Sequence, residues 1–204
     1  MVWSSPVNAR RVFEINGDLR NSPLIESVRR LHDLFSACGA PYAVVGGLAV
    51  VRCGAVRTTM DIDILTTKAA WEEVRQSAPT ESRTWFRMED DSATDRANDI
   101  DVDVLFADDE WGMVVPMPDP TEIREFDKDI GAWFVDLAHL IVLKTAAYLK
   151  KNAEDGIEIA AKDLADIVAL LRANRRQIGA SFWDRLPPSV RGEVEKIWNR
   201  IKSK

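Results

Sequence analysis

The feature that most constrains the fold is an apolar run that enters two glycines and is followed by two aspartates one residue apart. The segment VVGGLAV at 44–50 predicts a strand, a tight Gly-Gly turn and a short helix. The segment RTTMDIDIL at 57–65 predicts a second strand, largely apolar apart from its carboxylates. Because side chains alternate along a strand, we expect Asp61 and Asp63 to point the same way.

These residue types together indicate a site for phosphate and metal. Two like charges on one face of a buried strand are costly unless a cation neutralises them, and carboxylate oxygens suit Mg²⁺. Gly46 and Gly47 allow close approach of the backbone to a ligand, and the following helix offers N–H groups to phosphate. The arrangement favours phosphoryl or nucleotidyl transfer, the alternative being an Asp-x-Asp pair at a solvated strand end.

The pattern resembles the signature of the DNA polymerase beta type nucleotidyltransferase superfamily. An apolar residue and Gly-Gly are followed, after thirteen residues, by Asp-Ile-Asp-Ile. The form Arg57-x-Thr59-x-Asp61 resembles that of AbiEii-type toxins and of small antibiotic nucleotidyltransferases. The resemblance implies a nucleoside triphosphate (NTP) as co-substrate and two Mg²⁺ ions held by Asp61, Asp63 and a third carboxylate. It also implies triphosphate contacts from four residues: Gly46, Gly47, Arg57 and Thr59.

A third carboxylate is expected on the later strand 99–106, which reads DIDVDVLF. Alternation places Asp101 and Asp103 on one face of this strand. Asp103 is the first choice, because the family usually has an apolar residue, Leu and a further apolar residue after this aspartate. Asp101 is the alternative.

Two segments near the C-terminus extend the resemblance to the AbiEii-type enzymes. These are HLIVLKTAA at 139–147 and KDLADI at 162–167. The resemblance implies that Lys144 and Asp163 face the nucleotide cleft and belong to the catalytic set. The alternative is structural, with Lys144 forming a salt bridge to Asp163 or Asp166 that joins two helices.

The expected fold is α/β (α+β): a mixed sheet flanked by helices, with a C-terminal helical lobe. We expect a nucleotidyltransferase catalytic lobe at 1–135 and a helical lobe packed on it at 136–204. Apolar periodicity predicts helices at 22–39, 67–77, 137–151, 158–175 and 189–202, and Ser22, Thr67 and Asp136 are expected to cap the first three. Strands are expected at 42–45, 61–66, 84–88, 99–106 and 131–135, with an exposed turn at 90–99.

The composition of the chain restricts its expected binding partners and its expected cellular compartment. The chain has 204 residues, a formal charge of −6 and two cysteines, and it lacks an apolar stretch long enough to cross a membrane. The acidic balance argues against indiscriminate binding of nucleic acid. We expect a cytoplasmic protein with reduced thiols and no membrane association.

The predicted function is therefore metal-dependent transfer of a nucleoside monophosphate from an NTP to an acceptor hydroxyl, with release of pyrophosphate. The helical resemblance favours a toxin that acts on tRNA 3′ ends and has a cognate antitoxin. Two alternatives stay open. One is a small-molecule, antibiotic-modifying nucleotidyltransferase, and the other is an inactive module of the same fold that binds a nucleotide or a partner.

Overall fold

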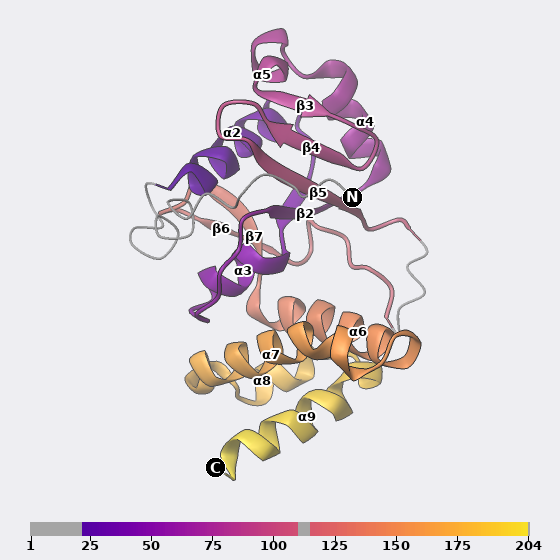
Figure 1. Ribbon diagram of the computed structural model, residues 1–204. Helices are drawn as coiled ribbons and strands as arrows, with labels where there is room; N and C mark the ends of the chain where they lie inside the picture. The colour runs from indigo at the N-terminus through magenta and orange to yellow at the C-terminus, as the bar shows by residue number, and fades with distance from the viewer. Residues whose placement is uncertain (1–21, 110–114, 204) are drawn as a thin grey trace, which may run out of the picture.

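The computed structural model describes residues 22–109 and 115–203. Within these residues the chain forms one mixed sheet of seven strands in the order β3-β4-β5-β2-β1-β7-β6. Figure 1 shows helices α6–α9 gathered on one side of the molecule and α4 and α5 near the opposite end. The strands are β1 Tyr42–Val44, β2 Ile62–Thr66, β3 Phe86–Met88, β4 Ser92–Asp95, β5 Ile100–Phe106, β6 Arg124–Asp127 and β7 Ala132–Val135. This architecture confirms the expected α+β fold class.

The helices follow the predicted segments closely. Three of them begin at the predicted caps, where the side chains of Ser22, Thr67 and Asp136 accept hydrogen bonds from backbone N–H groups three residues ahead. The helices are α2 Pro23–Ala37, α3 Gly46–Arg52, α4 Lys68–Ser77, α5 Thr80–Trp85, α6 Leu137–Glu154, α7 Ile157–Ala173, α8 Ala180–Asp184 and α9 Pro188–Lys202, with a 3-10 turn η2 at Arg175–Gln177.

The centre of the sheet is buried because its strands are apolar. β2 pairs with β1 in the antiparallel sense and with β5 in the parallel sense, and β1 also pairs in parallel with β7. All three residues of β1 are buried, and β2 exposes only part of Asp63. Both central strands therefore hold their neighbours in a fixed register.

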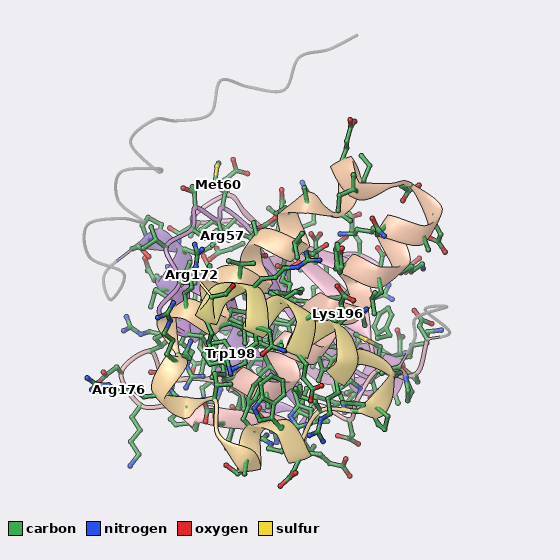
Figure 2. The ribbon with its side chains drawn as sticks, turned by 90° about the horizontal axis from the view of Figure 1, so that it is seen from below. Arg57, Met60, Arg172, Arg176, Lys196 and Trp198 are labelled. Carbon is green, nitrogen blue, oxygen red and sulfur yellow. The ribbon has the colours of Figure 1, made fainter. Side chains whose placement is uncertain are left out.

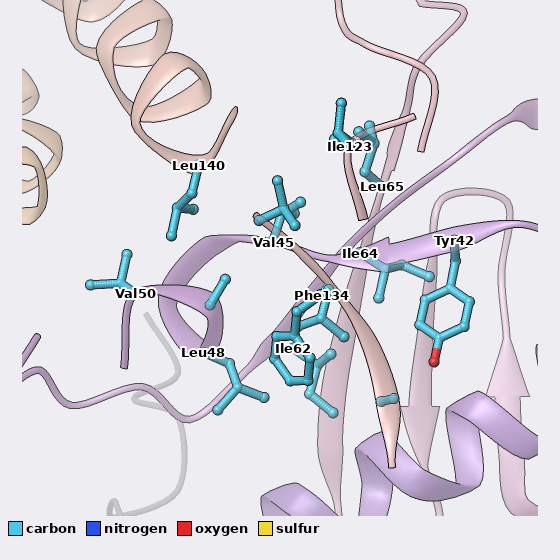
Figure 3. Packing of buried hydrophobic residues seen from close by; sticks show 14 of the residues in the cluster. Tyr42, Val45, Leu48, Val50, Ile62, Ile64, Leu65, Ile123, Phe134 and Leu140 are labelled. Atoms are coloured by element: carbon cyan, nitrogen blue, oxygen red, sulfur yellow. The ribbon is translucent and has the colours of Figure 1, made fainter. Parts of the chain in front are cut away.

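A single hydrophobic core joins the sheet to the helices on the C-terminal side. Figure 3 shows that Leu140 projects from α6 towards α3, which contains Val50, and towards Val45, which precedes α3. Figure 2 views the molecule from the helical side, with α9 in front; Trp198 of this helix is buried in the core. The proposed lobe boundary after residue 135 stays a prediction, and residues 1–21 of the first lobe lie outside the described part.

Two local predictions are wrong. The segment 90–99 contains strand β4, which pairs with both β3 and β5, so it is not an exposed turn. Asp95, at the end of β4, is fully buried. Its carboxylate is stabilised there by an ion pair with Arg30 of α2 at 3.0 Å and by a hydrogen bond from the backbone N–H of Ala97. The strand expected at 84–88 begins only at Phe86, because 80–85 is helix α5.

Two further elements, β6 and α8, are additions to the predicted set. In the described residues, 22–109 and 115–203, no helix combines the length and the apolar character that crossing a membrane requires.

Candidate active site

The turn between β1 and α3 is built around the side chain of Asp63. Gly46 has φ +59°, and a Cβ at this position would lie 1.8 Å from Oδ2 of Asp63. A Cβ on Gly47 would lie 2.4 Å from Oγ1 of Thr59. The backbone N–H of Gly47 donates to Oδ2 of Asp63 at 3.2 Å. Both glycines are therefore required by the close approach of side chains from β2 and the loop before it.

The register of β2 and β5 brings two carboxylates side by side. Asp63 lies directly opposite Asp103 in this parallel pair, so both project from the same face of strands about 4.8 Å apart. Asp61 lies one residue before β2, and its Oδ1 accepts a hydrogen bond from Thr59 at 2.7 Å. Asp101 shares the face of Asp103 and accepts a hydrogen bond from Thr94 of β4 at 3.1 Å.

Excess negative charge distinguishes this cluster. Burial raises the pKa of Asp63 above its usual value, and the charge of Asp61 raises it further, against the lowering effects of the Gly47 N–H and Lys144. Burial also raises the pKa of Asp103, with further increases from the charges of Asp63 and Asp61. Asp61, Asp63 and Asp103 therefore repel one another electrostatically, and a cation among them would relieve that repulsion.

The chemistry of these donors fits Mg²⁺. In the described ranges 22–109 and 115–203, no group of three or more His, Cys, Asp or Glu side chains is arranged so that it could hold a metal ion by itself. Mg²⁺ is commonly held by one or two carboxylates together with substrate phosphates, so a complete protein cage is not required. The carboxylates of Asp61 and Asp63 accept hydrogen bonds from Thr59 and Gly47, respectively.

A second cluster of charges lies between α6, α7 and the loop before β2. Lys144 Nζ is 3.1 Å from Asp163 Oδ1 and 2.9 Å from Asp166 Oδ2. Lys151 approaches the other oxygen of Asp163 at 2.7 Å, and Arg57 approaches Asp166 at 2.6 Å. Burial alone would raise the pKa of Asp163, but hydrogen bonds from Lys151 and Lys144 and their charges outweigh it and lower that pKa.

The two clusters meet at a pocket of about 440 Å³. Four predicted site residues line it: Gly46, Asp63, Lys144 and Asp163. Apolar side chains from β5, α6 and the segment before β6 complete one wall, namely Leu105, Met117, Leu140, Leu143 and Ala147. The pocket thus combines carboxylates, cations and an apolar wall.

The structure gives several predicted residues a protein partner. Lys144 forms both of the salt bridges considered as its structural alternative, and it also lines the pocket. The buried hydroxyl of Thr59 contacts Asp61, and Arg57 contacts Asp166, so the expected phosphate contacts of both residues stay predictions. Lys151 was missed, although its spacing of seven from Lys144 places both on one face of α6.

Comparison with solved structures places this architecture among known folds. Neither a family model nor a curated protein matches the sequence. The crystal structure of ANT(2″)-Ia in complex with adenylyl-2″-tobramycin superposes with a TM-score of 0.50 at 13% identity, over 89% of this chain and 98% of that one. The chain has a nucleotidyltransferase fold.

Two structures from Helicobacter pylori are also similar. JHP933 has a TM-score of 0.48 at 11% identity, over 97% of this chain and 96% of that one. A candidate nucleotidyltransferase has a TM-score of 0.45 at 15% identity, over 88% and 79%. At these identities the likeness concerns the fold alone, and the AbiEii-type subclass stays a prediction.

Proposed function

We propose that this chain is a nucleotidyltransferase that moves a nucleoside monophosphate from an NTP to an acceptor hydroxyl and releases pyrophosphate. The observation that carries the proposal is the pairing of Asp63 with Asp103 on adjacent strands, with the Gly46-Gly47 turn packed against Asp63. Mutually repelling carboxylates beside a glycine turn in this fold support metal-assisted phosphate chemistry.

The proposed roles of the three aspartates are metal binding and, for one of them, proton acceptance. Asp61, Asp63 and Asp103 would hold Mg²⁺, which supplies charge neutralisation of the triphosphate and of the leaving pyrophosphate. Asp103 is the most exposed of the three, and its raised pKa suits it to accept the proton of the acceptor hydroxyl. The acceptor oxygen forms a bond to the α-phosphorus as the bond between the α-phosphorus and its bridging oxygen breaks.

The glycine turn and the cations would hold the triphosphate. Gly47 donates its N–H to Asp63 in this structure, and phosphate would compete for that donor when the carboxylate turns towards a cation. Lys144 lines the same pocket as Gly46 and Asp63. Arg57 forms an ion pair with Asp166, which also pairs with Lys144. Arg57 would contact phosphate by exchanging Asp166 for a phosphate oxygen.

The acceptor belongs to one of two classes in this proposal. The resemblance of the α6 and α7 segments to AbiEii-type enzymes supports a tRNA 3′ end, and with it a cytoplasmic toxin that has a protein antitoxin. The ANT(2″)-Ia complex contains an adenylylated aminoglycoside, which supports a small cationic acceptor for this chain. An acidic chain of net charge −6 attracts such a cation more readily than it attracts RNA.

The decisive experiment supplies each of the four NTPs, labelled at the α-phosphate, with Mg²⁺ and either total tRNA or a panel of aminoglycosides. We expect label on one acceptor class and stoichiometric pyrophosphate, both lost with a chelator. The matched control is Asp63→Asn. NTP binding without transfer to either acceptor would favour the inactive binding module instead.

A further inference from the structure

A second polar hollow lies at the opposite end of the sheet from the helical lobe. It has a volume of about 650 Å³ and lies among α4, α5 and β3, which Figure 1 places far from α6–α9. Three arginines from three elements line it: Arg75 of α4, Arg83 of α5 and Arg96 in the loop after β4. The hydroxyl residues Thr80 and Thr84 of α5 also line it.

The hollow opens on the face of the sheet opposite the carboxylates. Arg87 of β3 donates to Thr94 at 3.2 Å, and Thr94 donates to Asp101, so these three side chains share the carboxylate face. Phe86 and Met88 flank Arg87 in the strand and therefore point the other way. Both of them line the hollow, which is thus separate from the candidate active site.

The charge of this hollow is unbalanced in the positive sense. Its described lining includes three arginines and no Asp or Glu. Arg75 ion-pairs with Glu72 at 3.2 Å and with the exposed Asp90 at 3.0 Å. Among residues 22–109 and 115–203, no carboxylate forms an ion pair with Arg83 or Arg96. Arg83 and Arg96, beside Arg75, therefore give the hollow a local positive potential that attracts an anion, although the whole chain has a net charge of −6.

We propose that this hollow binds a compact phosphorylated ligand, of the class of pyrophosphate or a nucleoside polyphosphate. Guanidinium groups present paired N–H donors that match phosphate oxygens, and arginines from three separate elements line this one hollow. Glu72 and Asp90, which ion-pair with Arg75, add negative charge beside the hollow, and this charge disfavours a long polyanion such as a nucleic-acid backbone relative to a small ligand.

The test measures binding of inorganic pyrophosphate to the full chain by calorimetry, in a buffer with chelator. The chelator removes divalent ions, so metal-dependent binding at the carboxylate cluster of β2 and β5 does not contribute, and the variants below report on the arginine hollow. The double variant Arg83→Gln/Arg96→Gln should weaken binding at least about tenfold, because each removes charge-assisted hydrogen bonds. The matched control Arg191→Gln/Arg200→Gln removes two exposed arginines from α9 and should leave affinity within about twofold.

Three outcomes would overturn the proposal: no pyrophosphate binding by the native chain, equal weakening in both double variants, or unchanged binding in Arg83→Gln/Arg96→Gln. The charge-retaining Arg83→Lys/Arg96→Lys should bind with intermediate affinity, and melting without ligand verifies folding. If the double variant does not fold, Arg96→Gln alone carries the test. A single-stranded RNA that binds more tightly than pyrophosphate, and is lost in the same variant, would contradict the compact ligand.

Discussion

Two acidic clusters approach the same pocket, and they differ in what neutralises them. At β2 and β5, Asp63 and Asp103 face other carboxylates, and their pKa values are raised by burial and mutual repulsion. Between α6 and α7, Asp163 is held by Lys151 and Lys144, and its pKa is lowered. Aspartates therefore have raised pKa values in the first cluster and a lowered pKa in the second.

The contrast predicts that the cluster at β2 and β5 binds a ligand and that the cluster between α6 and α7 stabilises the fold. Asp163 and Asp166 join the helices to each other and, through Arg57, to the loop before β2. Their desolvation is offset inside the protein, as buried ion pairs require. Asp63 receives only the Gly47 N–H and the charges of Lys144 and Arg57, which do not outweigh its burial and the repulsion from Asp61. The pKa values of Asp63 and Asp103 therefore stay raised, and a bound cation would relieve this repulsion.

The strongest test of this contrast is removal of one charge from the unbalanced cluster. Asp63→Asn should lower transfer activity about a thousandfold or more, because losing a metal carboxylate removes about 4 kcal/mol of charge stabilisation. Melting temperature in metal-free buffer should hold or rise, since like-charge repulsion is relieved. Steady-state kinetics and thermal melting on the same preparation check both statements.

The companion pair Asp103→Asn and Asp101→Asn identifies the third carboxylate. Asp103→Asn should resemble Asp63→Asn, whereas Asp101→Asn should retain activity within about tenfold. Equal losses in both would contradict the preference for Asp103. A large fall in melting temperature for Asp63→Asn with activity retained would show that this carboxylate is structural.

A smaller effect is expected from Lys144→Ala, which probes whether the balanced cluster also serves the nucleotide. Asp163 keeps Lys151 and Asp166 keeps Arg57, so stability should fall by about 1–2 kcal/mol. Stripping a buried charge of its only partner would cost more, about 3–5 kcal/mol. If Lys144 contacts the triphosphate, NTP affinity should fall about ten- to a hundredfold. Denaturant unfolding and calorimetry measure the two quantities.

The matched variant for Lys144→Ala is Asp166→Ala, which strips a carboxylate from both Arg57 and Lys144. It should destabilise the fold more than Lys144→Ala does. NTP affinity unchanged in Lys144→Ala would remove this lysine from the proposed nucleotide site and leave it as a link between helices.

The smallest expected effect is the acid sensitivity of the balanced cluster. The folded pKa of Asp163 is lowered, so its contribution to stability is complete above the unfolded value of about 3.9 and is lost as pH falls through the lower folded pKa. Asp163→Asn should therefore flatten the dependence of unfolding free energy on pH below about 4. Urea titrations across that range measure the slope, and identical slopes in both proteins would contradict the assignment.

Much of the fold could be predicted from local chemistry. The caps at Ser22, Thr67 and Asp136 and the apolar periodicity defined helix positions, because these signals act within a few residues. Strand alternation placed Asp101 and Asp103 on one face for the same reason. The half-buried strand β4 was not predicted, because its polar residues are stabilised by neighbouring strands and by Arg30 of α2.

The amino-acid sequence by itself determined which residues are the candidates for chemistry: two glycines, an aspartate pair, a later aspartate strand and a lysine on an apolar helix. Only the tertiary structure decided their partners. The parallel register sets Asp63 against Asp103, and the packing of α6 on α7 gives Lys144 two carboxylates. Those pairings join residues distant in the chain, and their geometry follows from how sheet and helices pack rather than from any local pattern.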